Sequence, residues 1–272
     1  FLSLKPQCIE PSPGTPYDPN EFVPIYKRKG PQHAPDDMQE LLLNPPKPPG
    51  SCPEGASLWL LGRHLHDPHA RGLAESFNAG KWRHLKYVNF ASNNISYLGF
   101  NHVMHAIADG ATPLLEQLAV SDNPFGDLGA SGLGMAISKG SMPNLLTLDA
   151  NRCGIGDRGA CAIWSALGEG HTKKMESIYL KEQQIGDEGH EAMCKAFKGG
   201  ADGALPKLWH LQLGGNQLTD EGCLVMANAI EAGDLAHVRN LYVMPSPVSV
   251  DGQEVVQQTI DEMGYKQLHV FF

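Results

Sequence analysis

The stretch "LTLDANRCGIGDRGACAIWSAL", residues 146–167, decides which fold the chain can adopt. An apolar run leads into Gly154-x-Gly156-x-x-Gly159, and a segment with the apolar spacing of a helix follows. Glu182 stands at the end of the next apolar run. Strand, glycine fingerprint, helix, strand and acidic residue thus occur in the order that a dinucleotide-binding unit requires. Two interpretations are open: an enzyme that binds a nicotinamide cofactor, or one unit of a longer repeated pattern.

A repeat period of about 30 residues decides between them. One apolar anchor position recurs in every unit: Leu65, Ile95, Phe125, Ile155, Ile185, Leu218 and Val248. Upstream of each anchor stand two apolar residues two positions apart, such as Leu148 and Ala150, which predicts a short strand with one buried face. Downstream, a pair such as Ile163 and Leu167 predicts the buried stripe of a helix. The pattern predicts seven strand–helix units, and "KQLHVFF", residues 266–272, predicts a closing eighth strand.

The helix ends also recur with this period. Two positions after the anchor stands an aspartate in five of the seven units, where it can accept the first free N–H groups of the helix that follows: Asp67, Asp127, Asp157, Asp187 and Asp220. Glycines recur further along as expected left-handed C-terminal caps: Gly80, Gly110, Gly140, Gly170, Gly200, Gly233 and Gly264.

The glycine fingerprint of residues 154–159 does not recur in the other repeat units. The position of Gly154 holds histidine, asparagine, proline or glutamine in the other units. Only the position of Gly159 is mostly glycine, and there we expect it to open the helix beside the strand of its own unit. The alignment therefore predicts repeat structure, and no cofactor is expected.

Two segments carry a family resemblance. "LEQLAVSDNPFGDLGA", residues 115–130, and "LWHLQLGGNQLTDEG", residues 208–222, resemble the L-x-x-L-x-L-x-x-N-x-L pattern of leucine-rich repeats. The repeat length and the helical second half are similar to the ribonuclease-inhibitor-like class, shared with NOD-type receptors and Ran GTPase-activating proteins. The resemblance covers residues 56–272 and implies an α/β fold. That fold is a leucine-rich-repeat solenoid (horseshoe) of seven strand–helix repeats plus a closing strand.

In this family the pattern's asparagine bonds loop backbone between turns. Here that position holds Asn93, Asn123 and Asn216, but elsewhere it holds Arg63, Cys153, Gln183 and Ser246. The resemblance therefore implies a patchy asparagine ladder.

The first 55 residues follow different rules. They hold most of the chain's 20 prolines. Because proline fixes φ and lacks an N–H donor, this segment cannot join the interior of a sheet. We expect two parts: an extended Pro-rich N-terminal arm, residues 1–55, and the solenoid, residues 56–272. The arm is expected to lie on its own domain, on a partner, or on both.

Composition narrows the function classes. The net charge of −9 and the absence of a basic run longer than Lys27–Lys29 argue against nucleic acid as a partner. No apolar stretch approaches 18 residues, so no transmembrane segment is expected. The six cysteines form no C-x-x-C pair, which favours reduced thiols in an intracellular compartment, either the cytoplasm or an organelle interior.

The sequence argues against a metal site and against an enzyme active site. His64, His66 and His69 in "GRHLHDPHARG", residues 62–72, have donor chemistry that suits zinc or copper. They fall in the first repeat, where capping units are irregular, so the sequence favours a polar loop over a metal site. No signature of a hydrolase, phosphate loop or paired carboxylates appears, so the chain is not expected to be an enzyme.

The candidate binding residues come from the strands. In this repeat class the side chains between the buried strand positions point into the concave face. The expected partner-binding residues there are Trp59, Tyr87, Asn89, Asp149, Tyr179, His210, Gln212 and Tyr242. The sequence thus predicts a non-catalytic interaction or scaffold protein that is a subunit of a multi-subunit complex. It would bind protein partners through the concave face and the arm. The alternative is a GTPase regulator resembling Ran GTPase-activating proteins, with Arg63, Arg152 and Arg158 at the loop edge.

Overall fold

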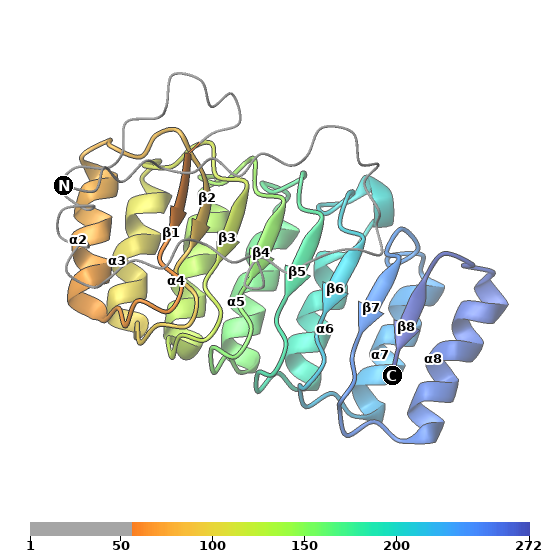
Figure 1. The fold of residues 1–272 in the computed structure, drawn as a ribbon. Helices are drawn as coiled ribbons and strands as arrows, with labels where there is room; N and C mark the ends of the chain where they lie inside the picture. The colour runs from red at the N-terminus through yellow and green to blue at the C-terminus, as the bar shows by residue number, and fades with distance from the viewer. Residues whose placement is uncertain (1–55) are drawn as a thin grey trace, which may run out of the picture.

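The computed structural model describes residues 56–272, and the Pro-rich arm predicted for residues 1–55 lies outside the described residues. Strands and helices alternate throughout the described part (Figure 1). The strands are β1 (Ala56–Trp59), β2 (Leu85–Asn89), β3 (Gln117–Ala119), β4 (Thr147–Asp149), β5 (Ser177–Tyr179), β6 (His210–Gln212), β7 (Asn240–Tyr242) and β8 (His269–Phe271). The helices are α2 (Asp67–Asn78), α3 (Tyr97–Ala108), α4 (Gly126–Ser138), α5 (Asp157–Gly168), α6 (Asp187–Ala196), α7 (Asp220–Glu231) and α8 (Val250–Met263), with a short 3-10 helix, η3 (Gly200–Asp202).

The eight described strands form one parallel sheet in sequence order, β1 to β8. The seven helices α2 to α8 line one side of this sheet (Figure 1). The prediction of seven strand–helix units and a closing strand is therefore confirmed for residues 56–272. We call the side of the sheet opposite these helices the open face.

The core lies between the sheet and the helices. The middle residue of each strand from β3 to β7, such as Leu118 or Leu148, is fully buried, whereas Val270 of the edge strand β8 is half-buried. The predicted helical pairs face it, and Ile163 and Leu167 are also fully buried. Phe100 and Phe125 stack with their ring centroids 4.0 Å apart, so aromatic packing links repeats two and three.

The recurring aspartates stand at the helix starts, as predicted. Each one, however, bonds the start of the next repeat's helix and not, as the sequence suggests, the start of its own helix. Asp127 Oδ1 accepts hydrogen bonds from the N–H groups of Gly156, at 2.7 Å, and Gly159, at 3.0 Å, at the start of the following helix. Asp157 repeats this arrangement with the next unit. Parallel stacking places each helix start beside the preceding one, so the carboxylate reaches across the repeat boundary. The other three behave alike: Asp67 with Ser96, Asp187 with Thr219, and Asp220 with Ser249.

This contact corrects the role assigned to Gly159. A Cβ atom on Gly159 would lie 2.6 Å from Asp127 Oδ1, so glycine is needed to admit the carboxylate of the preceding repeat. The same collision would occur at Gly99, Gly189, Gly222 and Gly252. The last glycine of the apparent cofactor fingerprint therefore makes room for a contact between repeats. Six of the seven predicted cap glycines are confirmed, because each has positive φ at the end of its helix. The prediction is wrong for Gly200, which begins η3, since α6 already ends at Ala196.

Candidate functional site

Strand register places all eight predicted binding residues on the open face. Six of them lie in one row across the sheet, together with Ala119 and Phe271, which are not among the predicted binding residues. We call this the central row: Trp59, Asn89, Ala119, Asp149, Tyr179, Gln212, Tyr242 and Phe271. Tyr87 and His210 lie in the adjacent row. Because side chains alternate between the two faces of a strand, both rows point away from the helices.

None of the eight predicted binding residues is fully exposed to solvent. Trp59, Tyr87, His210, Gln212 and Tyr242 are half-buried. The remaining three, Asn89, Asp149 and Tyr179, are buried. Asn89 and Asp149 turn a side-chain oxygen back onto their own sheet: the Asn89 Oδ1 atom accepts the Ala91 N–H at 3.0 Å, and Asp149 joins the cluster described next.

Asp149 is the centre of a polar cluster on the open face. Its Oδ1 atom accepts hydrogen bonds from the Ser121 hydroxyl and, at 2.7 Å, from Asn151 Nδ2. The Asn151 N–H in turn donates to Ser121 Oγ at 2.7 Å. Asp149 Oδ2 is buried and has no hydrogen-bond partner within residues 56–272. Burial raises the pKa of the Asp149 carboxyl to about 6, although the Ser121 hydrogen bond acts in the opposite direction.

Aromatic side chains continue from this cluster toward β8. Ring centroids are 5.2 Å apart for Tyr179 and His210, 5.5 Å for His210 and Tyr242, and 4.3 Å for the stacked pair Tyr242 and Phe271. We call these four residues the aromatic row. Burial lowers the pKa of His210 to about 4, so its ring is neutral near pH 7. Sequence reasoning missed Phe271, although the alternation in the closing strand places it in register with Tyr242.

The asparagine ladder runs along the loops at the carboxyl ends of the strands. Asn123 Oδ1 accepts the Ile95 N–H at 3.1 Å, and its Nδ2 donates to the carbonyl oxygens of Phe90 and Val120. Asn93 and Asn216 make equivalent bonds. The expected gap at Gln183 does not exist. Its longer side chain accepts from the N–H groups of Cys153 and Ile155 and donates to Ala150 O.

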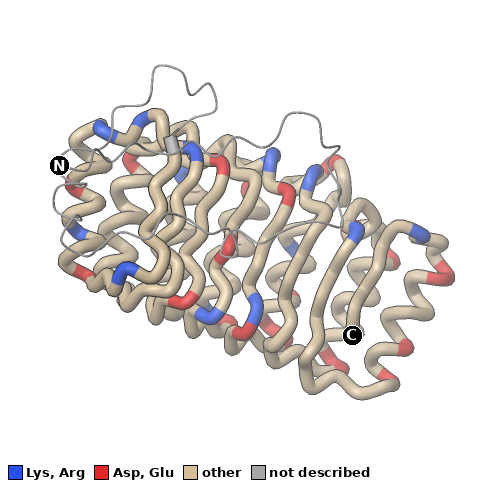
Figure 2. The backbone as a smooth tube through the Cα atoms, in the orientation of Figure 1, with Lys and Arg blue, Asp and Glu red and all other residues tan. Residues whose placement is uncertain are grey.

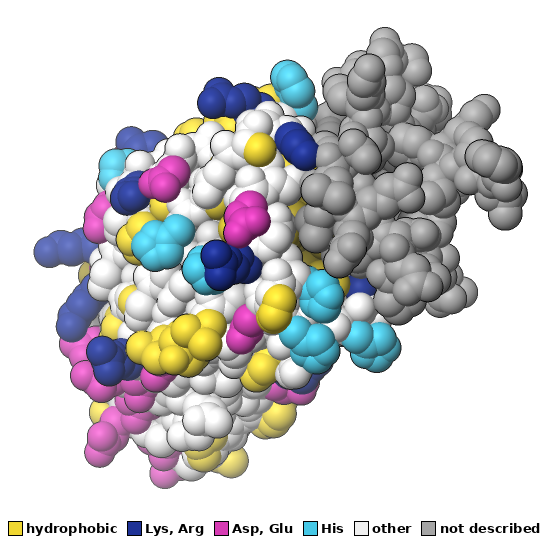
Figure 3. Space-filling model, turned by 90° about the vertical axis from the view of Figure 1, so that its left-hand side faces the viewer, with side chains coloured by type: hydrophobic (Ala, Val, Ile, Leu, Met, Phe, Trp, Pro, Cys, Tyr) yellow, Lys and Arg dark blue, Asp and Glu magenta, His cyan; other side chains and the backbone are white. Residues whose placement is uncertain are grey.

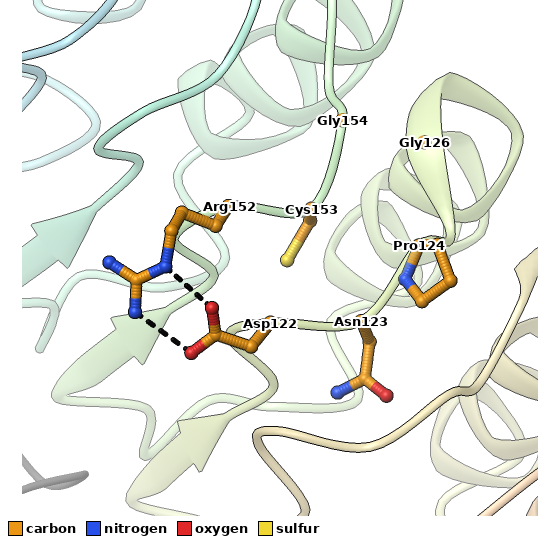
Figure 4. A pocket seen from close by; sticks show the side chains of 7 residues that line it. All are labelled: Asp122, Asn123, Pro124, Gly126, Arg152, Cys153 and Gly154. Atoms are coloured by element: carbon orange, nitrogen blue, oxygen red, sulfur yellow. Dashed lines mark hydrogen bonds and ion pairs between the residues drawn. The ribbon is translucent and has the colours of Figure 1, made fainter.

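The ladder does change at Cys153. Its thiol donates at 3.2 Å to Asn151 O, and the Phe125 N–H turns back to Asn123 O instead of bonding the next repeat. A pocket lies beside this site, as Figure 4 shows, lined by Asp122, Asn123, Pro124, Gly126, Arg152, Cys153 and Gly154. Burial raises the pKa of the Cys153 thiol to about 12, so the thiol stays protonated and is a poor nucleophile.

Arg152, a predicted loop-edge candidate, is held between two carboxylates. Its guanidinium bonds Asp122 through Nε, at 2.5 Å, and Nη2, at 2.8 Å (Figure 4). Nη1 lies 3.6 Å from Glu182, which also pairs with Lys181. Both neighbouring carboxylates raise the pKa of Arg152. Its charge is already compensated within the loop edge. Arg158 is exposed on α5.

The histidine cluster forms the start of α2. The His66 N–H donates to His69 Nδ1 at 3.1 Å, and Asn94 Nδ2 lies 3.3 Å from His66 Nδ1. Figure 3 looks onto this end of the molecule and shows several histidine side chains gathered there. In the part of the chain that the structure describes, no group of three His, Cys, Asp or Glu side chains could hold a metal ion. Among the same residues, no helix is long and apolar enough to cross a membrane.

The comparison with protein-family models agrees with the repeat architecture. Residues 113–134 and 204–227 match the family model described as Leucine Rich repeat. No curated protein matches the chain. A solved structure of the leiomodin-1 actin-binding site 2 has 14% identity and a TM-score of 0.46, over 71% of this chain and 95% of that one. A structure of a Bacteroides fragilis protein has 13% identity and a TM-score of 0.43, over 74% of this chain and 59% of that one. The ribonuclease-inhibitor-like class stays a prediction.

Proposed function

We propose that this chain, a leucine-rich repeat protein and thus built on a protein-binding fold, is a non-catalytic interaction protein that binds a protein partner through its open face. The observation that carries the proposal is the aromatic row beside Asp149, on the side of the sheet that lies opposite helices α2 to α8. Tyrosine and histidine rings offer large contact areas and lose little side-chain entropy on binding.

The charge distribution supports a protein partner over nucleic acid. Lys86 and Asp149 are the charged residues of the eight described strands. Figure 2 shows that most basic and acidic residues lie on the loops and helices instead. A nucleic-acid surface needs a basic face that neutralises phosphates, and the net charge of −9 does not favour one.

The proposal extends to a scaffold subunit of a larger assembly in a reducing compartment inside the cell. The open face would hold one partner, and the Pro-rich segment outside the described residues would supply a second contact. Four cysteines of residues 56–272 are free thiols, which supports the reducing compartment: Cys153, Cys161, Cys194 and Cys223. The GTPase-regulator alternative stays a prediction, and of its three loop-edge arginines Arg152 supports it least, since Asp122 and Glu182 already pair with its guanidinium.

One substitution pair tests the proposed surface. The full chain is used as bait in an extract of its source cells, and captured proteins are identified by mass spectrometry. Gln212→Arg puts a long charged side chain in the central row, whereas Gln258→Arg makes the same change on an exposed position of α8. We expect a specific partner to be captured equally by the wild type and Gln258→Arg, and at least about tenfold less by Gln212→Arg. Equal capture by all three chains would contradict binding at the open face.

A further inference from the structure

Asp149 stands at one end of the aromatic row. The register pairs Asp149 on β4 with Tyr179 on β5, and Tyr179 begins the row of rings that runs to Phe271 on β8. Asp149 is the one acidic residue in the eight described strands. The open face therefore combines a single carboxylate with a line of aromatic rings.

One oxygen of the Asp149 carboxylate lacks a hydrogen-bond donor in residues 56–272. Asp149 is 1% exposed, and the oxygen is its Oδ2 atom. A buried carboxylate oxygen without a donor is costly, and a cationic donor placed against it offsets that cost. Tyr179 is the register partner of Asp149 on the neighbouring strand, and the π face of an aromatic ring also favours a cation. The chemistry of the site thus suits a lysine or arginine side chain.

The aromatic row specifies the residues that accompany this cation. Aromatic-lined surfaces bind proline-rich segments, because a polyproline helix is already ordered and its rings stack on aromatic side chains. A ligand with prolines on both sides of a basic residue would therefore satisfy both parts of the surface. The chain itself contains such a segment, "NPPKPPG", residues 44–50, in which Lys47 is the only lysine or arginine with proline on both sides.

We propose that residues 44–50 of the same chain dock on the open face, with Lys47 against Asp149 and the adjacent prolines on the aromatic row. The inference rests on the proposed function for the choice of surface. It adds an internal ligand, with which any protein partner that uses the aromatic row must compete. The segment is thereby assigned an autoinhibitory role.

The length of the intervening chain permits this contact. Lys47 precedes Ala56, the first residue of β1, by nine residues. At about 3.1 Å per residue, a polyproline helix of that length spans about 28 Å. Asp149 on β4 is three strands from β1, about 14 Å across the sheet. Continuing upstream from Lys47, Pro46 and Pro45 would meet the aromatic row in the direction in which it runs.

Photocrosslinking within the full chain tests the proposal. With p-benzoylphenylalanine in place of Pro46, we expect crosslinks to peptides containing Tyr179, His210 or Tyr242, located by mass spectrometry. The same group in place of Pro13, in a different proline-rich stretch, is the positional control and should not label these peptides. Lys47→Gln and Asp149→Asn should each lower the yield about fivefold, as expected for loss of a charge pair, whereas Lys5→Gln should leave it unchanged.

The outcomes separate this inference from the proposed function. Crosslinks to the helices, no crosslinks, or equal yield in Lys47→Gln would overturn the docking of residues 44–50. A yield that falls on dilution would assign the contact to a second copy of the chain and overturn docking within one chain. If the crosslinks fail while Gln212→Arg still releases the partner, only the inference is wrong. If the crosslinks form as expected while Gln212→Arg keeps the partner, only the proposed function is wrong.

Discussion

The loop edge and the open face of this solenoid use side chains in opposite ways. Along the loop edge, aspartate, asparagine and glycine recur at the repeat period, and each bonds or admits a group of a neighbouring repeat, as Asp127 does with Gly159. Along the central row the residue type changes from strand to strand, and Asp149 keeps an oxygen without a partner in residues 56–272. Positions that repeat within the chain hold the fold together, and positions that vary are available for recognition.

The largest expected effect comes from removing a repeating loop residue. Asn123→Ala would leave the Ile95 N–H buried without its acceptor and would remove a donor from the carbonyl oxygens of Phe90, Val120 and Ser121. We expect the free energy of unfolding to fall by about 2–3 kcal/mol, measured by urea denaturation. Asn144→Ala is the control, since its half-buried amide bonds Pro113 O and Lys174 at the surface. An equal loss in both variants would contradict a special role for the ladder.

A second substitution tests the pairing of glycine with the preceding aspartate. A Cβ atom at Gly222 would overlap Asp187 Oδ1, so Gly222→Ala should lower the free energy of unfolding by about 2–3 kcal/mol. Adding Asp187→Ala removes the overlapping carboxylate, so the double variant should lose about 1 kcal/mol less than the sum of the two single losses. The control is Gly168→Ala, where the nearest heavy atom to a new Cβ is 3.4 Å away. Strictly additive losses would argue against the pairing.

The sequence period was sufficient to predict the architecture, but it could not assign the aspartate contacts. In a chain with a regular period, a carboxylate at the start of one helix is equally well placed in sequence for its own helix and for the next one. Only the lateral stacking of repeats shows that Asp127 reaches Gly156. The same limit applied to Gln183. Its amide makes the hydrogen bonds that asparagine makes in other repeats, and this depends on both the length of the side chain and the position of the backbone.

The candidate surface could be predicted in part. Two-residue alternation predicted which side chains share the open face, because strand geometry fixes that directly. It could not predict that Tyr179 and Asp149 are buried, since burial depends on neighbours in three dimensions. It also missed Phe271, because the closing strand has no helix after it to complete the repeat pattern that marked the other units.

A substitution at Asp149 on the open face should raise the free energy of unfolding, whereas the loop variants lower it. The pKa of Asp149 is raised to about 6 in the folded state, so folding becomes less favourable as pH rises from about 4 through 6 and this carboxyl loses its proton. Asp149→Asn keeps the acceptor for Ser121 and removes the buried charge. With Lys47→Gln in both chains, so that this lysine cannot offset the charge, we expect Asp149→Asn to raise the unfolding free energy at pH 7 by about 1–2 kcal/mol, and the difference to disappear near pH 4. A difference independent of pH would show that the charge is not its cause.

The smallest effect is expected at a loop-edge position that does not repeat. Arg152 occupies a position that holds Gly62, Ser92, Asp122 and Glu182 in other repeats, and its ion pair with Asp122 is partly exposed. Arg152→Ala should therefore cost less than about 1 kcal/mol, and the loss should shrink at high salt. Thermal unfolding at low and high sodium chloride measures both. A salt-independent loss as large as that of Asn123→Ala would break the rule that only repeating positions hold the fold.

The most direct test of this division compares Tyr242→Ala, on the open face, with Asn216→Ala, on the ladder of the preceding repeat. The measurement is the affinity of each folded variant for the partner identified by capture, under conditions where both remain native. We predict that Tyr242→Ala weakens binding at least about tenfold, whereas Asn216→Ala lowers stability and leaves the affinity of the folded protein unchanged. Unchanged binding by Tyr242→Ala, or an equal loss in Asn216→Ala, would contradict the assignment of recognition to the open face.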